Sequence, residues 1–328
     1  MILFIGSGMG VGHLSADYYL SSDSTFADFS NVALLDTRPL GERWITDAAA
    51  AATALATGEM VTPGTVSLKN DIPLTTLLEA ARSHQKATGV VTTTSLTQAV
   101  SAAFLTHAQY WGKEYELARQ IAYSNTDVLL GGGRRFFEHR DSDSHNLILT
   151  MQDRGYTLIS QQQQLETLDL EKTEKLLGLF ATEALRQADH RNLSLQMMTE
   201  KAVRLLEKNR NGYVLIVEGA QIDWRSHERD SAGLLAEMQD FANAIRWTLD
   251  YQKKHPNLLI VVTGLNDTGG VFLIRDNQQR GQIGIEFASS DHTANLSPVF
   301  AKGPQSERIR GIVSIGELGR ILMNLIKN

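Results

Sequence analysis

Short apolar runs rich in β-branched residues recur along the chain, and turn residues follow each of them. They lie at residues 2–5, 32–35, 90–93, 128–130, 213–217 and 258–263. Runs of this length without polar alternation are typical of parallel strands buried on both faces. Amphipathic stretches such as 234–249 lie between them, with apolar residues at i, i+3 and i+4. This alternation predicts an α/β fold, a doubly wound, mostly parallel sheet with helices on both faces.

The length of 328 residues suits one large α/β domain with insertions. We expect a single domain over residues 1–328, with a polar surface excursion at about 136–193 that includes a glutamine run at 161–164. Because 42% of the residues are hydrophobic, the chain can bury a core without a metal. Any bound metal is therefore expected to serve function rather than folding.

Charge and composition exclude several classes of protein. The net charge of −6 and the lack of a Lys/Arg-rich run argue against a nucleic-acid partner. The lack of cysteine excludes thiolate zinc sites and cysteine nucleophiles. The first apolar run is too short for a membrane span or a signal peptide, so neither is expected in the chain as given, and the compartment is not determined.

Turn residues at 6–8, 36–37, 218–219 and 263–264 follow four of the expected strands. In doubly wound sheets the ligand crevice lies beyond the carboxyl ends of the strands, so these turns predict one site. Val11 stands where a dinucleotide-binding fingerprint needs its third glycine, which favours a tight turn over a phosphate cradle. Asp47 precedes an alanine run and is expected to cap a helix.

Asp223 and His227 are one helical turn apart, a spacing at which both side chains can bind one Zn²⁺. A solvent-exposed Asp/His pair on a helix has the same spacing. Taken alone, the spacing favours such an exposed pair over a zinc site. His292 cannot be assigned to the same site from spacing.

The chain resembles the alkaline phosphatase family in a series of segments that occur in the family order. These are residues 2–10, 46–54, 127–133, 176–180, 217–227, 263–270 and 292–293. The resemblance implies the family fold, a three-layer sandwich, and a site in which two zinc ions and one magnesium ion hold a phosphate monoester. It also implies a serine nucleophile at a helix N-terminus and a covalent intermediate.

Only one of the implied metal sites is complete in this sequence. Asp223, His227 and His292 match the three ligands of the zinc that activates water. The second zinc would need acids and a histidine at the positions of Ser7, Leu265 and Asn266, so it is not expected to bind.

The magnesium site keeps Glu218 but shares the lost acid at Ser7, and Gln98 and Val100 replace its other polar ligands, so Mg²⁺ is not expected either. The serine nucleophile corresponds to Ala48. The phosphate-binding arginine corresponds to Trp111, and Arg43, Arg134, Arg135 and Arg225 are alternative sources of positive charge.

These losses favour a pseudoenzyme that has lost phosphomonoesterase activity, has no catalytic residue at Ala48 and keeps one zinc. One alternative is a one-zinc hydrolase of phosphate or other esters with water as the nucleophile. Another is that Asp223, His227 and His292 are vestigial and bind no metal. By resemblance, we expect a small phosphate-containing ligand and a homodimer; family members are commonly exported or periplasmic.

Overall fold

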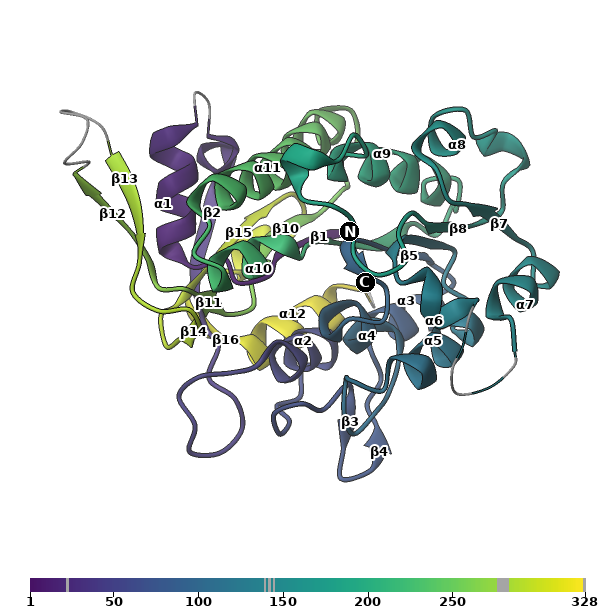
Figure 1. Cartoon of the computed structure of the whole chain (residues 1–328), viewed down its shortest axis with the longest axis horizontal. Helices are drawn as coiled ribbons and strands as arrows, with labels where there is room; N and C mark the ends of the chain where they lie inside the picture. Colours follow the sequence, from purple (N-terminus) through teal and green to yellow (C-terminus); the bar gives the residue numbers. More distant parts are fainter. Residues whose placement is uncertain (22–23, 139, 141–142, 144, 276–282, 327–328) are drawn as a thin grey trace.

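The computed structural model of the chain describes residues 1–21, 24–138, 140, 143, 145–275 and 283–326 (Figure 1). Its centre is a ten-stranded sheet in which β15 alone, among the described strands, runs antiparallel to both of its neighbours. The strands are, in order across the sheet, β16 (Gly311–Ser314), β2 (Asn31–Asp36), β15 (Ser297–Lys302), β10 (Ile260–Gly264), β1 (Ile2–Gly6), β9 (Tyr213–Gly219), β5 (Ala87–Ser95), β6 (Val128–Gly132), β8 (Lys175–Leu179) and β7 (Tyr156–Ile159). The predicted α/β fold with a mostly parallel sheet is confirmed.

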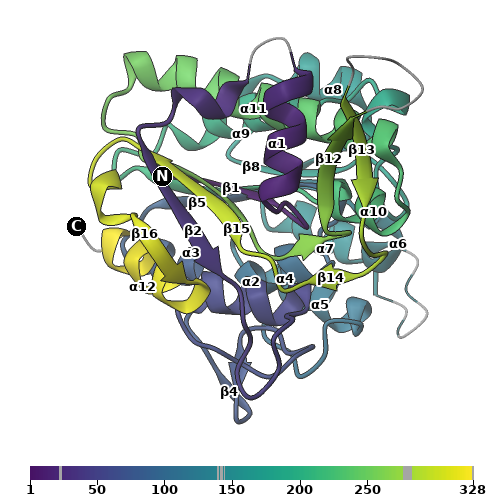
Figure 2. The same cartoon turned by 90° about the vertical axis from the view of Figure 1, so that its left-hand side faces the viewer.

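Helices cover both faces of this sheet, as the two perpendicular views show (Figures 1 and 2). One layer contains α1 (Val11–Leu20), α9 (Leu195–Leu206) and α11 (Ser231–Lys254). The other contains α2 (Ala48–Thr57), α3 (Leu77–Ser83), α4 (Ala99–Leu105), α5 (Glu114–Tyr123) and α12 (Ile315–Ile326). The result is a sheet between two helical layers.

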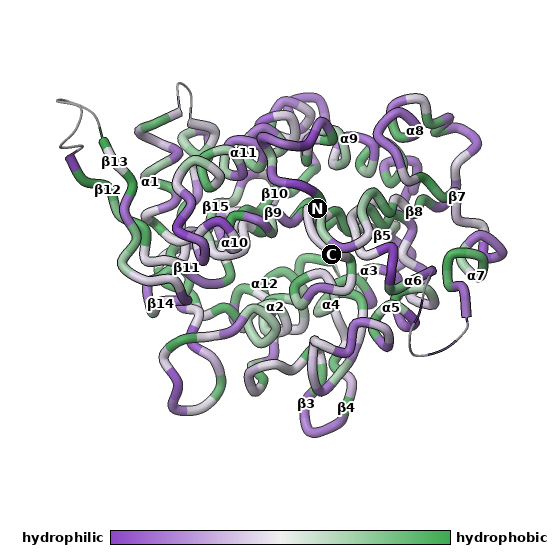
Figure 3. The backbone as a smooth tube through the Cα atoms, in the orientation of Figure 1, coloured by the Kyte–Doolittle hydropathy of each residue, from purple (hydrophilic) through white to green (hydrophobic). Residues whose placement is uncertain are grey.

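The side-chain alternation of β1 shows how the two cores arise. Leu3 and Ile5 pack in the core that contains α2, whereas Ile2 and Phe4 pack in the core that contains α11. The rings of Phe4 and Phe241 meet edge to face, with centroids 5.9 Å apart. Because successive residues of a strand point to opposite faces, one apolar run supplies both cores, and apolar colour follows the central strands in Figure 3.

All six apolar runs that predicted strands form strands of the sheet, and 234–249 lies within α11. The segment at about 136–193 differs from the expected polar surface excursion. It contains α6 (Arg134–Phe137, in part), α7 (Leu147–Asp153) and α8 (Gln162–Glu166), but it also contributes β7 and β8 to the sheet edge. The physical reason is burial, because Leu176 and Leu177 lie between the two helical layers with no exposure.

The remaining elements are short and lie outside the main sheet. A two-stranded ribbon of β12 (Val271–Arg275) and β13 (Ile283–Phe287) extends beside α1 (Figures 1 and 2). β11 (Asp267–Thr268) pairs with β14 (His292–Thr293), and β3 (Leu68–Lys69) pairs with β4 (Ile72–Pro73). Among the described residues, no helix combines the length and apolarity that crossing a membrane requires.

Candidate metal-binding site

The carboxyl ends of three neighbouring strands meet at the candidate site. In the parallel register, Gly6 of β1 lies opposite Gly219 of β9 and Gly264 of β10. The turns after these strands therefore emerge at the same level, as the sequence predicts. β9 leads through Ala220 directly into α10 (Gln221–His227), which carries Asp223 and His227.

The structure brings Asp223, His227 and His292 together, with one ligand atom from each lying within 4.8 Å of the others. Asp223 Oδ2 is 3.5 Å from His227 Nε2, and Asp223 Oδ1 is 3.6 Å from His292 Nε2. His292 reaches the cluster from β14, which the pairing of Thr268 with His292 holds beside β11. This contact is the one that sequence spacing left open.

Both imidazoles are oriented by backbone carbonyls. His227 Nδ1 lies 2.7 Å from the carbonyl oxygen of Ser290, and His292 Nδ1 lies 2.8 Å from that of Thr46. A carbonyl can only accept, so each Nδ1 carries a proton, and Nε2, which faces Asp223, is the nitrogen that would release its proton to bind a metal. This is the arrangement that metal-binding histidines use.

Charge also couples the three side chains. The hydrogen bond to Asp223 raises the pKa of His227 to about 9, against the opposing effect of burial. Burial alone would raise the pKa of Asp223, but His227, His292 and Thr268 hold it below its usual value. Without a metal, the cluster is therefore an aspartate paired with a histidinium at neutral pH.

Two of the three positions that the resemblance assigns to a second zinc have other roles. Leu265 is fully buried in the core beneath α2. Asn266 donates to Thr268 Oγ1 at 2.7 Å and to Asp223 Oδ1 at 3.3 Å, and Thr268 also donates to Asp223 Oδ1. Asn266 and Thr268 therefore position Asp223, and this role was not foreseen from the sequence.

Glu218 does not join the Asp223 cluster. Its carboxylate accepts hydrogen bonds from Ser7, Thr92 and Ser101 at 3.0, 2.8 and 3.0 Å. Burial raises the pKa of Glu218, and the three hydroxyl donors oppose that effect. Among the described residues, the cluster of Asp223, His227 and His292 is the only group of three or more acids and histidines placed to hold a metal ion.

The helix to which the resemblance assigns the nucleophile is well formed and begins with alanine. Asp47 caps α2 as predicted, and its Oδ1 accepts from the backbone amides of Ala49, Ala50 and Gly64 at 3.0 to 3.1 Å. Ala48 is the first helical residue and lines the cavity, where its methyl group offers no attacking atom. Ser7, whose hydroxyl lies in the turn after β1, donates to Glu218.

A cavity of about 320 Å³ joins these positions. It brings together the metal cluster and most of the altered positions, and its wall is formed by Ser7, Asp47, Ala48, Ala49, Thr94, Gln98, Ala99, Val100, Trp111, Glu218, Ala220, Asp223, Trp224, His227 and His292. None of these is lysine or arginine. Trp224 was not singled out from the sequence; its place on α10 next to Asp223 was the available signal.

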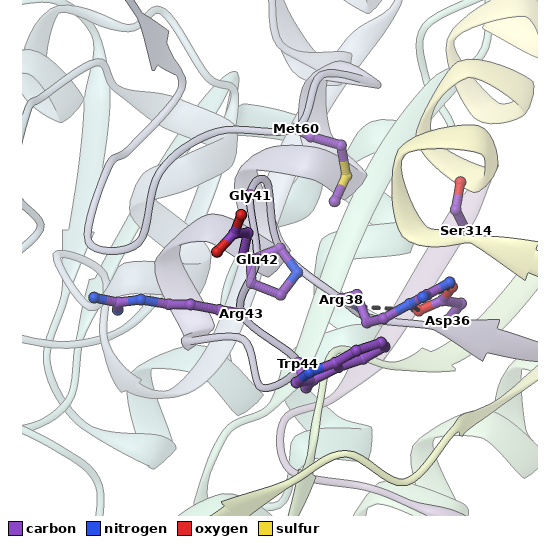
Figure 4. A pocket seen from close by; sticks show the side chains of 9 residues that line it. Asp36, Arg38, Gly41, Glu42, Arg43, Trp44, Met60 and Ser314 are labelled. Atoms are coloured by element: carbon purple, nitrogen blue, oxygen red, sulfur yellow. Dashed lines mark hydrogen bonds and ion pairs between the residues drawn. The ribbon is translucent and has the colours of Figure 1, made fainter.

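None of the four arginines considered as sources of positive charge lines this cavity, although Arg135 lines an adjoining hollow with Gln98 and Trp224. Arg134, Arg135 and Arg225 form ion pairs with glutamates, namely Glu138, Glu183 and Glu228. Arg43 lines a separate hollow of about 460 Å³ next to the loop that follows β2. In Figure 4 its side chain points away from the Asp36–Arg38 ion pair and from Trp44.

A buried group of His13, Ser226 and Asp267 lies next to the site and was not expected from the sequence. His13 Nε2 is 2.9 Å from Ser226 Oγ, and His13 Nδ1 is 3.7 Å from Asp267. The Gly10 amide donates to Nδ1, so the proton is on Nε2 and points at Ser226, whose hydroxyl donates to the carbonyl of Ile222. This polarity is opposite to that of a hydrolytic triad, and all three side chains are buried, so the group is structural.

Comparisons with known proteins agree with this architecture. Residues 1–283 match the model of the family described as alkaline phosphatase. Alkaline phosphatase 3 of Bacillus subtilis is 35% identical over 82% of this chain. The match spans only 61% of that relative's length. Streptomycin-6-phosphate phosphatase of Streptomyces griseus is 30% identical over 95% of this chain and 87% of its own length.

A solved structure shows the same fold over nearly the whole chain. Alkaline phosphatase from the Antarctic bacterium TAB5 superposes with a TM-score of 0.93 at 30% identity, covering 99% of this chain and 97% of that one. A mutant of the TAB5 protein is described with magnesium bound, and the family is metal-dependent. From its sequence and its fold, this chain belongs to the alkaline phosphatase family.

Proposed function

We propose that this protein is a pseudoenzyme of the alkaline phosphatase family that binds one zinc ion and has lost phosphomonoesterase activity. The observation that carries the proposal is the cavity wall, which has Ala48 at the position of the nucleophile and no lysine or arginine. Covalent phosphoryl transfer needs an attacking atom and positive charge around the transferred group.

Zinc fits the cluster of Asp223, His227 and His292. One carboxylate and two imidazoles form a common zinc donor set, and both Nε2 atoms already face Asp223. When bound, zinc would supply a Lewis acid with an open fourth position. The residues around it would orient a ligand rather than attack it.

Electrostatics argues against a phosphate monoester as a substrate. The dianion would meet the carboxyl groups of Asp47, Asp223 and Glu218 in the same cavity, with positive charge only from zinc or a histidinium. Charge that develops in the transition state would be poorly stabilised. A small phosphate-containing ligand, as the names of the relatives suggest, would therefore bind mainly through zinc.

A one-zinc hydrolase is the second candidate function. Three protein ligands with an open position also describe catalytic zinc sites, and the convergence of both Nε2 atoms favours this candidate over a vestigial site. Because the cavity lacks arginine and lysine, a phosphodiester or a non-phosphate ester is the better substrate class. We also propose that the chain forms a homodimer, which light scattering on the purified protein would test.

Metal content and turnover test the proposal directly. We expect about one zinc per chain in the unaltered protein and in His190→Ala, an exposed control outside the cluster, and none in His227→Ala. We expect no turnover of p-nitrophenyl phosphate in any of the three. Monoester turnover that disappears in His227→Ala would overturn the pseudoenzyme reading, and equal zinc in all three proteins would show that the cluster is vestigial.

A further inference from the structure

We propose that a hydroxyl cage, made by Ser7, Thr92 and Ser101 around Glu218, takes the structural place of the magnesium ion that the resemblance implies at this position. Glu218 then links separate elements through buried hydrogen bonds and is not a metal ligand. The inference does not depend on zinc at the neighbouring cluster.

Both oxygens of the carboxylate have hydrogen-bond donors. Glu218 is 2% exposed at the end of β9. Ser7 occupies Oε1 at 3.0 Å, and Thr92 and Ser101 occupy Oε2 at 2.8 and 3.0 Å. A buried carboxylate without partners would be strongly destabilising, so these donors remove the need for a cation.

The direction of the protons supports this reading. Thr92 Oγ1 accepts from the Thr94 amide at 3.2 Å and also contacts the Thr94 hydroxyl at 3.2 Å. Its own proton is therefore available for Glu218. A metal binds to the lone pairs of carboxylate oxygens, and here the hydroxyl protons point at those lone pairs. The hydroxyl cage and a cation would therefore compete for the same oxygens of Glu218.

The surrounding positions do not restore an oxygen site for a cation. Val100 is 3% exposed and apolar, and the Gln98 amide lies 3.4 Å from Glu114 on the other side. Mg²⁺ demands near-octahedral oxygen ligands and usually more than one carboxylate or phosphate. Here the hydroxyl next in sequence to Val100, on Ser101, contacts Glu218 instead.

The cage connects four segments that are far apart in the chain. It joins the turn after β1, the strand β5, the helix α4 and the strand β9, with contacts that span 211, 126 and 117 residues. Ser7 precedes Gly8, whose backbone packs against Asp223. The cage therefore also supports the floor of the zinc cluster.

Magnesium titration of the unaltered protein, with zinc content held constant, is the first arm of the test. We expect no change in Tm and no binding heat with millimolar Mg²⁺. A Tm increase with Mg²⁺ that is absent in Glu218→Gln would overturn the proposal, because it would show that Glu218 is a metal ligand. The expected result is read on the native chain alone, and Glu218→Gln serves only to assign a response to Mg²⁺ if one is seen.

Removal of the donors is the second arm. We expect Thr92→Val and Ser101→Ala to lower Tm by several degrees more than Thr199→Val, whose buried hydroxyl only donates to a carbonyl of its own helix. The two cage variants should also be non-additive, because both act on Glu218. A decrease in Tm equal to that of Thr199→Val would overturn the structural role of the cage. Neither result would change the zinc content measured for His227→Ala, so the two proposals fail separately.

Discussion

Gly8 shows how one residue sets the geometry of the site. It lies in the turn after β1 with φ of 78°, a left-handed conformation that glycine adopts without steric cost. A Cβ atom at this position would lie 2.7 Å from the Cα of Asp223. The turn therefore approaches Asp223 so closely that only glycine fits.

Gly8→Ala should damage both stability and metal binding. The left-handed conformation alone costs alanine about 1 kcal/mol, and we expect the variant to lose clearly more unfolding free energy than that. We also expect zinc affinity to fall by about tenfold or more, because Asp223 must shift. Chemical denaturation and competition with a zinc chelator measure the two effects. Gly155→Ala is the matched control, because Gly155 has φ of 87° and no atom within 4 Å of an added Cβ; similar results for both variants would contradict the prediction.

At the scale of elements, α2 is stabilised along its whole length, although alanine stands where the resemblance implies a serine. Its alanine-rich sequence favours a helix, Asp47 caps its start, and Gly58 ends it in the left-handed conformation. α12 packs against it so closely that a Cβ at Gly319 would lie 2.4 Å from the carbonyl oxygen of Ala54. The helix is held by packing on several sides, so its placement did not depend on the residue at position 48.

The contact between α3 and the segment after α4 should make stability depend on pH. His107 Nε2 lies 3.0 Å from Glu79, and Nδ1 lies 2.8 Å from the carbonyl of Ser67. Burial alone would lower the pKa of His107, but these hydrogen bonds raise it above its usual value of 6.5. Burial alone would raise the pKa of Glu79, but His107 and the Thr76 amide hold it below its usual value of 4.5.

The sign of the effect follows from these directions. Because the pKa of His107 is raised in the folded state, its contribution to stability is complete below pH 6.5 and is lost as the pH rises through the pKa of the folded protein. Because the pKa of Glu79 is lowered, its contribution to stability is present above pH 4.5. We therefore expect Glu79→Gln to cost more at pH 6 than at pH 9, by about 1 kcal/mol, in urea denaturation. Glu116→Gln, which removes an exposed pair with Lys113, should cost the same at both values. A pH-independent cost for Glu79→Gln would contradict the prediction.

At the scale of the whole molecule, the site depends on segments from most of the chain. The cavity combines the turn after β1, the start of α2, the segment from β5 to α4, α10 and β14. The altered residues of the resemblance are spread over these segments, so no single substitution would rebuild the family site.

Ala48→Ser should therefore leave the protein without monoesterase activity. The new hydroxyl would stand at the N-terminus of α2, but Trp111, Leu265 and Asn266 would still supply neither positive charge nor a second zinc. We expect no increase in p-nitrophenyl phosphate turnover or in covalent phosphate by intact-mass measurement, with correct folding checked by circular dichroism. Turnover in Ala48→Ser that Ala49→Ser lacks would contradict the prediction.

The sequence by itself determined the local structure of this protein. The β-branched runs form the predicted strands because burial on both faces selects such residues, and Asp47 caps α2 because its carboxylate reaches nearby amides. Asp223 and His227 share one face of α10 because their spacing matches a helical turn. The sequence likewise gives the alanine at position 48, where the resemblance implies a serine.

Only the tertiary structure decided which distant residues meet. His292 meets Asp223 and His227 because β14 pairs with β11, and Ser101 of α4 reaches Glu218 at the end of β9. β15 enters the sheet antiparallel, and β7 and β8 extend its edge, although their short runs carry no signal of partner or direction. Local patterns set the conformation of each segment, whereas contacts between segments depend on the packing of the whole chain.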